Sequence, residues 1–115
     1  MKLDYDLIRN LLIEIEDISD GQINYFPQYF YNKFSNLPEN TVWYHLKYLS
    51  DINFIECSSS LVVIDISPYG RDYLNSIRDE NIWNKTNTLS QSLGQVTLSV
   101  ISEIATSLIK RTLGL

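Results

Sequence analysis

The chain has 115 residues, of which 44% are hydrophobic, so it can build one modest core with an appendage and is too short for two full domains. Its nine Lys and Arg stand against 14 Asp and Glu, and the net charge of −5 is the opposite of what a typical nucleic-acid-binding domain carries. The single cysteine, Cys57, excludes an internal disulfide and a cysteine-rich zinc cluster.

The amino-terminal end and the hydropathy pattern bear on location. Charges interrupt the first six residues, which lack the apolar core of a signal peptide, and no apolar run approaches membrane-spanning length. We therefore expect a cytoplasmic protein that makes no membrane contact.

Charge is unevenly distributed along the chain. Residues 1–66 hold ten acidic and four basic side chains, whereas residues 67–115 hold four acidic and five basic ones. The amino-terminal part is therefore strongly acidic.

The first predicted helix follows Asp4, whose side chain can cap it, and ends at Ser19. Six apolar side chains recur along it at helical spacing and predict one buried side: Leu7, Ile8, Leu11, Leu12, Ile15 and Ile18. Residues 22–25 then alternate polar and apolar side chains, which predicts a short strand.

Two further helices are predicted next. Pro27 opens a short second helix that runs to Phe34. Asn36 and Glu39 have the spacing of a capping box and predict the start of a third helix. The apolar stripe of this third helix consists of Val42, Leu46 and Leu49. Asn53 follows it and tolerates the left-handed backbone that often ends a helix.

A β-hairpin is predicted after the third helix. Residues 54–57 and 61–66 are rich in β-branched side chains and flank a serine turn at residues 58–60. Ser67 as a cap and Pro68 at the first helical position predict that another helix leaves the hairpin.

The carboxyl-terminal part has a different composition. Residues 82–93 form a polar segment with helical character, and residues 97–113 predict an amphipathic helix. The apolar side of that last helix consists of Leu98, Ile101, Ile104, Ala105, Leu108 and Ile109. This side can pack on its own domain or pair with a second copy of the chain. We favour a homodimer, because the preceding helices and hairpin already close most of a small core.

Residues 41–55 resemble the second helix of a helix-turn-helix leading into a wing, as in the arsenic-repressor superfamily. The matching residues are Thr41, Val42, His45, Leu46 and Leu49, and Ile52 and Asn53 stand where that superfamily usually has Ala-Gly. The resemblance implies an α+β winged helix-turn-helix of three helices and a short β-hairpin wing at residues 1–78. Residues 79–115 would be a carboxyl-terminal helical extension, with a possible role in dimerisation.

Four segments spread over the chain carry a second resemblance. They are MKLDYDLIR at 1–9, YHL at 44–46, IRDENIWNK at 77–85 and LIKRTLGL at 108–115. Together they resemble an uncharacterised family of bacterial and bacteriophage proteins, known only as a domain of unknown function. The resemblance implies a winged-helix fold and a bacterial or prophage source, and it brings no established activity.

Catalytic and metal-binding residues are sparse. The only nucleophile-and-base pair involving a histidine and a cysteine is His45 with Cys57, which the predicted fold places on separate elements. No group of Cys, His and carboxylates has metal-ligand spacing, and no glycine-rich phosphate loop is present. We expect a nonenzymatic protein without cofactor or metal.

The third helix is the predicted contact surface. The side away from its apolar stripe carries Asn40, Thr41, Trp43, Tyr44, Lys47 and Tyr48. Only one of these is a cation, whereas rigid aromatic rings are the anchors that protein interfaces favour. We therefore predict a small regulator or host-interaction factor that binds a protein partner. The alternative is a DNA-binding transcriptional regulator, in which Asn40 would read adenine and Lys47 guanine or a phosphate.

Overall fold

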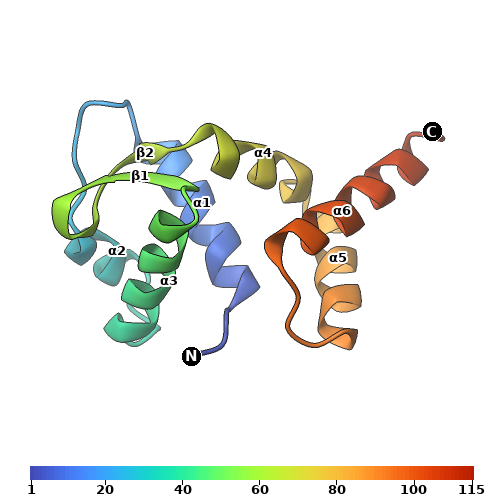
Figure 1. The fold of residues 1–115 in the computed structure, drawn as a ribbon, viewed down its shortest axis with the longest axis horizontal. Helices are drawn as coiled ribbons and strands as arrows, with labels where there is room; N and C mark the ends of the chain where they lie inside the picture. The colour runs from blue at the N-terminus through green and yellow to red at the C-terminus, as the bar shows by residue number, and fades with distance from the viewer. The chain divides into compact units, whose positions relative to one another are not determined.

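The computed structural model describes residues 1–115, which form six α-helices and one two-stranded antiparallel sheet, a mixed α+β fold (Figure 1). The chain divides into two units, Leu3–Arg71 and Asp72–Leu115. None of the helices combines the length and the apolar character that crossing a membrane requires.

Helix α1 (Tyr5–Ile18) begins where the sequence predicts. The Asp4 carboxylate accepts a hydrogen bond from the Leu7 amide at 3.0 Å and so satisfies one of the free donors of the first turn. The buried side of α1 consists of Tyr5, Leu7, Ile8, Leu11, Leu12 and Ile15, whereas the predicted Ile18 is only half-buried. These side chains form the largest part of the core of the first unit.

The predicted strand at residues 22–25 is wrong apart from its last residue. Tyr25 forms a single antiparallel bridge with Val63, through two hydrogen bonds of 2.8 Å. Before it, one carboxylate oxygen of Asp20 accepts hydrogen bonds from the amides of Gln22 and Ile23. This local turn competes with strand pairing, as short acidic side chains commonly do.

Helix α2 (Pro27–Lys33) buries Phe30 and leads through a short turn to helix α3 (Glu39–Asp51). The predicted capping box is wrong, because Pro38 occupies the cap position and no side chain caps α3. The predicted apolar stripe of α3 is confirmed: Val42, Leu46 and Leu49 are all fully buried.

His45 is also fully buried, and it ties α3 to the start of α1. Its Nε2 accepts a hydrogen bond from the Asp4 amide at 2.8 Å, since an amide N–H can only donate. Its Nδ1 lies 2.8 Å from the Thr41 carbonyl oxygen and donates to it. Both ring nitrogens are therefore engaged by backbone groups.

The predicted hairpin is confirmed. Asn53 adopts a left-handed backbone with φ of 61° and turns the chain out of α3. Strands β1 (Ile55–Ser58) and β2 (Val62–Ile66) then pair in antiparallel fashion, joined by a single 3₁₀ turn at Ser59–Leu61. The register shifts once, between Glu56 and Cys57.

A tight junction follows β2, where α4 (Pro68–Ile77) begins. The Ser67 hydroxyl donates to the Asn53 carbonyl and accepts from the Gly70 amide at 3.1 Å. A Cβ at Gly70 would stand 2.1 Å from the Phe54 carbonyl oxygen. Only glycine allows α4 to pass this close to the chain leaving α3.

The second unit is built around helices α5 (Glu80–Ser92) and α6 (Leu98–Thr112), which pack against each other. Their caps are Asp79 and Thr97, whose side chains accept hydrogen bonds from amides three residues on. A hydrogen bond of 3.0 Å between the hydroxyls of Ser76 and Ser102 joins α4 to α6.

Gly70→Ala is expected to lower the free energy of unfolding by about 3 kcal/mol, because the added methyl group meets a backbone carbonyl that cannot move aside. Urea unfolding followed by circular dichroism measures this change. Asp72→Ala, at an exposed position of the same helix, is the control and should change stability by less than about 0.5 kcal/mol. Equal stability of the two variants would contradict the close approach.

His45→Phe is expected to cost about 2 kcal/mol, because it keeps an aromatic ring at this position and leaves the Asp4 amide without its acceptor. Hydrogen exchange of that amide should accelerate more than the exchange of amides in the middle of α1. Lys47→Ala, on the exposed side of α3, serves as control for the unfolding measurement. An unchanged exchange rate at Asp4 would show that the imidazole does not hold the start of α1.

Candidate functional site

The outward side of α3 carries the predicted contact residues. Asn40, Trp43 and Lys47 are exposed at helical spacing, and Asp51 continues their line one turn later. Trp43 keeps 42% of its surface accessible, although burial is the usual state of so large an aromatic side chain. This line of four side chains, together with Tyr44, is called the α3 contact face below.

The predicted residues Thr41, Tyr44 and Tyr48 are half-buried at the edge of this face. The Tyr44 ring meets the His45 ring edge-on, with centroids 5.7 Å apart. Burial raises the pKa of Tyr48, and the neighbouring phenols of Tyr5 and Tyr44 raise it further. Trp43 is therefore the most accessible aromatic side chain on this side of α3.

The cations of this unit from Lys33 onward are paired with carboxylates. Lys47 Nζ lies 2.7 Å from a carboxylate oxygen of Asp51 on the same helix. Lys33 pairs with Glu14 at 3.8 Å, and the Arg71 guanidinium pairs with Glu16 at 2.8 Å. These are all the Lys and Arg residues between positions 10 and 71. No cation in that stretch is left without a carboxylate neighbour.

Acidic side chains remain on the same surface without such compensation. Glu39 is exposed in the first turn of α3, and Glu56 is exposed on β1. The turn of the hairpin, Ser59–Leu61, carries no charge. The field around the α3 contact face is therefore negative, which attracts cationic surfaces and repels phosphate chains.

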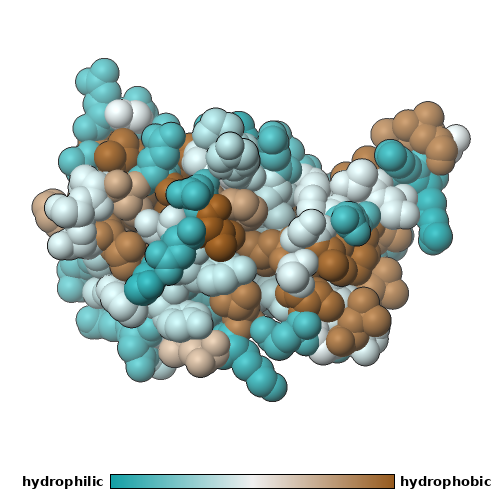
Figure 2. Space-filling model, viewed as in Figure 1, coloured by the Kyte–Doolittle hydropathy of each residue, from teal (hydrophilic) through white to brown (hydrophobic).

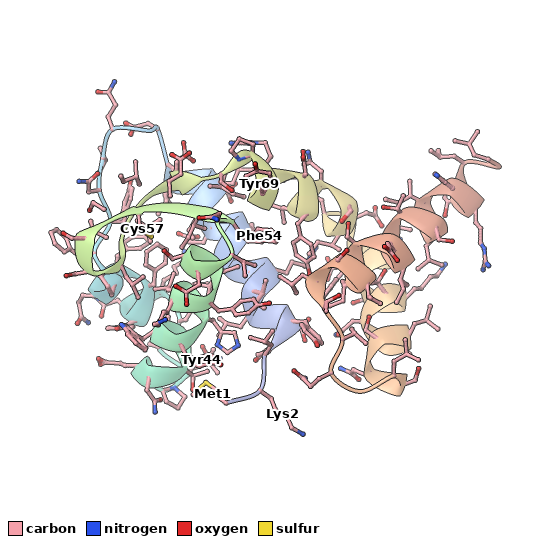
Figure 3. The ribbon with its side chains drawn as sticks, viewed as in Figure 1. Met1, Lys2, Tyr44, Phe54, Cys57 and Tyr69 are labelled. Atoms are coloured by element: carbon pink, nitrogen blue, oxygen red, sulfur yellow. The ribbon has the colours of Figure 1, made fainter.

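His45 and Cys57 are not arranged as a catalytic pair. Both imidazole nitrogens are taken up by backbone groups, as described above. Burial raises the pKa of the Cys57 thiol, and a smaller opposing effect comes from its hydrogen bond with Ser50. Figure 3 shows Cys57 on β1 and Tyr44, the neighbour of His45 in sequence, nearer the other end of α3. A thiol kept protonated and away from a base is a poor nucleophile.

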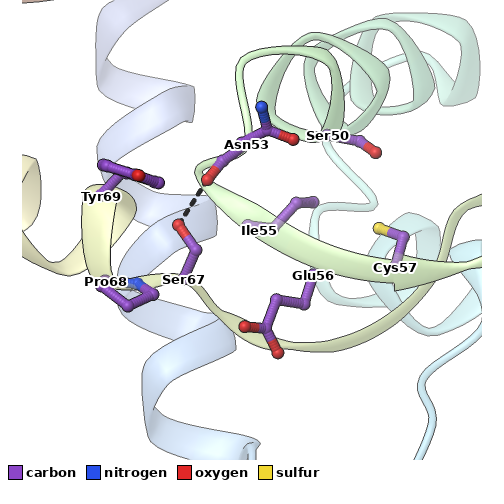
Figure 4. Close-up of a pocket in the computed structure, with 8 residues that line it drawn as sticks. All are labelled: Ser50, Asn53, Ile55, Glu56, Cys57, Ser67, Pro68 and Tyr69. Atoms are coloured by element: carbon purple, nitrogen blue, oxygen red, sulfur yellow. Dashed lines mark hydrogen bonds between the residues drawn. The ribbon is translucent and has the colours of Figure 1, made fainter.

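A hollow of about 450 Å³ beside Cys57 was missed by sequence reasoning (Figure 4). It lies where the end of α3, strand β1 and the first turn of α4 meet, and a hydrogen bond joins two of its lining residues, Ser67 and Asn53. Its lining includes Ser50, Glu56 and the exposed Tyr69. The chain contains no group of three His, Cys, Asp or Glu side chains that could hold a metal ion.

The predicted dimerisation residues of α6 fall into two sets. Leu98, Ile101 and Ala105 are buried, whereas Ile104, Leu108 and Ile109 are half-buried. The first set is covered within the chain, so a second copy could touch only the outer set.

Comparisons with known proteins give the family. A family model described as "Hypothetical protein (DUF2513)" matches residues 2–96. An uncharacterised protein of Haemophilus influenzae is 30% identical over 122 residues, which cover 98% of this chain and 99% of that protein. No solved structure matches the chain. The predicted resemblance to a family of unknown function is thus confirmed: the chain belongs to the DUF2513 family.

Proposed function

We propose that the protein is a nonenzymatic winged-helix module that acts by binding a protein partner with a cationic surface. The α3 contact face would make this contact. The observation that carries the proposal is the combination of an exposed Trp43 with a surface on which Lys33, Lys47 and Arg71 are all paired with carboxylates.

The winged-helix assignment is supported by the order and connections of the elements in the first unit. Three helices precede a β-hairpin, a short turn joins α2 to α3, and α3 leads directly into β1. The bridge between Tyr25 and Val63 stands where such folds add a short third strand to the wing. Fold alone does not decide what the module binds, so the side chains of α3 carry the functional argument.

A cationic partner fits the α3 contact face in two ways. Lys and Arg side chains of a partner can stack on the accessible indole of Trp43. They can also pair with Glu39 and Asp51, whose carboxylates lie at the two ends of the same helix. Aromatic anchors ringed by charge are the usual centre of a protein interface. A small regulator or host-interaction factor from a bacterium or prophage would work in this way.

DNA binding is the rival function, because this arrangement of helices and wing often serves it. To contact phosphates, Lys47 would have to leave Asp51, and the wing turn offers no cation to follow it into the minor groove. Counterion release by so few charges would give weak binding.

The proposal predicts which substitutions reduce partner recovery. Tagged wild-type protein, a Trp43→Ala/Tyr44→Ala variant and a Glu39→Gln/Asp51→Asn variant are used as baits in extracts of cells that encode the protein. We expect each variant to recover at least about tenfold less of the partner protein than wild type does. The reason is that a few aromatic and charged side chains carry most of the binding energy of an interface. Phe26→Ala, an aromatic exposed in another segment, should recover as much as wild type.

The same extracts distinguish the rival. If nucleic acid is the recovered species, nuclease treatment removes it, and neutralising Glu39 and Asp51 increases its recovery, because acidic side chains oppose phosphate binding. That result would favour the transcriptional regulator. Equal protein recovery by all baits would show that the α3 contact face is not the contact surface.

A further inference from the structure

We infer that the second unit is a dimerisation module, in which a trough along α5 receives the end of α6 from a second copy of the same chain. The trough consists of two adjoining hollows of about 430 and 460 Å³ that share Lys85. This inference is independent of what the α3 contact face binds.

The trough is apolar along most of its length. Its first hollow lies between Leu89 of α5 and Leu108 of α6, and exposes far more apolar than polar surface. Its second hollow is lined by the apolar side chains of Ile82, Ile109 and Leu113, and by four polar residues, Asp79, Asn81, Lys85 and Thr112. Shape and lining therefore suit the side of an apolar helix.

Leu89 and Leu113, which line the trough, are large exposed apolar side chains, and the carboxyl-terminal residue Leu115 is exposed as well. Leu89, Leu113 and Leu115 are 48%, 67% and 85% exposed. Figure 2 shows apolar surface over the helices of the second unit and again at the carboxyl-terminal tip of α6. Exposed apolar patches of this kind mark association surfaces.

Charge identifies a second copy of this unit as the occupant. Residues 72–115 hold four basic and four acidic side chains, whereas residues 3–71 hold four basic and ten acidic ones. Two copies of the second unit can therefore meet without net repulsion, which two copies of the first unit cannot. Self-pairing through the neutral unit also leaves the acidic one open to other partners.

The charges around the trough are placed for a two-fold arrangement. Asp79, at the start of α5, lines the same hollow as Leu113, at the end of α6. In the proposed dimer, a two-fold axis at this end would pair Lys110 and Arg111, in the last turn of α6, with Asp79 and Glu80, at the start of the other copy's α5. The contact forms twice by symmetry, as an isologous interface requires.

Sedimentation equilibrium of the full chain between about 1 and 100 µM tests the inference. We expect wild type to sediment as a dimer whose dissociation constant rises about tenfold or more in Leu89→Glu and in Leu113→Glu. Phe26→Glu places the same charge at an exposed aromatic position of the first unit and should leave the dissociation constant unchanged. Circular dichroism verifies that the variants, all at exposed positions, remain folded.

Charge reversal provides the second arm. Glu80→Lys and Lys110→Glu should each weaken the dimer, and the two together should restore it, because the pair is exchanged across the axis. A single-chain mass for wild type at every concentration would overturn the inference. An unchanged dissociation constant in both Leu89→Glu and Leu113→Glu would also overturn it. The same holds if Phe26→Glu weakens the dimer as much as the leucine variants do.

Discussion

The junction around Ser67 is the constraint on which the first unit depends. One hydroxyl joins the carbonyl at the end of α3 to the amide of Gly70 in the first turn of α4, and the Ser67 amide donates to the Phe54 carbonyl at 3.0 Å. These hydrogen bonds close the base of the hairpin. The backbone of α4 at Gly70 approaches the backbone at Phe54 so closely that only glycine fits. A closed hairpin base fixes the end of α3, just as His45 fixes its middle against the start of α1.

Because the end and the middle of α3 are both fixed, one side of the helix packs in the core and the opposite side is exposed to solvent. The available side is chemically mixed, since an accessible indole lies between two carboxylates and a lysine that already has a partner. Exposed ion pairs contribute little to stability, about 0.3–0.5 kcal/mol at this helical spacing. Such a pair also cancels the positive charge that contact with a phosphate chain would need.

Much of this fold could be predicted from the sequence because its signals are local. The side chains of Asp4 and Ser67 accept hydrogen bonds from amides three residues further on. The left-handed turn after α3 lies at Asn53, a residue type that tolerates this conformation. Long-range features could not be predicted in this way. The pairing of Arg71 with Glu16 joins residues 55 positions apart, and the strand expected before Tyr25 gives way to hydrogen bonds made by Asp20.

In the candidate site too, local features could be predicted from the sequence and long-range packing could not. Helical spacing alone indicated which side of α3 faces outward, and Trp43 is indeed exposed. Spacing did not reveal that Tyr48 is half-buried, because its burial depends on how neighbouring elements pack against α3. Likewise the trough of the second unit involves the outer edge of α6, whereas the sequence stripe also included Leu98 and Ile101, which are buried.

If the α3 contact face binds a protein partner as proposed, its acidic and aromatic side chains should give it only weak affinity for duplex DNA. Fluorescence anisotropy with a pool of random duplex fragments, over a series of salt concentrations, tests it most directly. We expect only weak binding at physiological salt, with no loss on Lys47→Ala or Asn40→Ala. Tight binding to selected duplexes at that salt, abolished by either substitution, would contradict it.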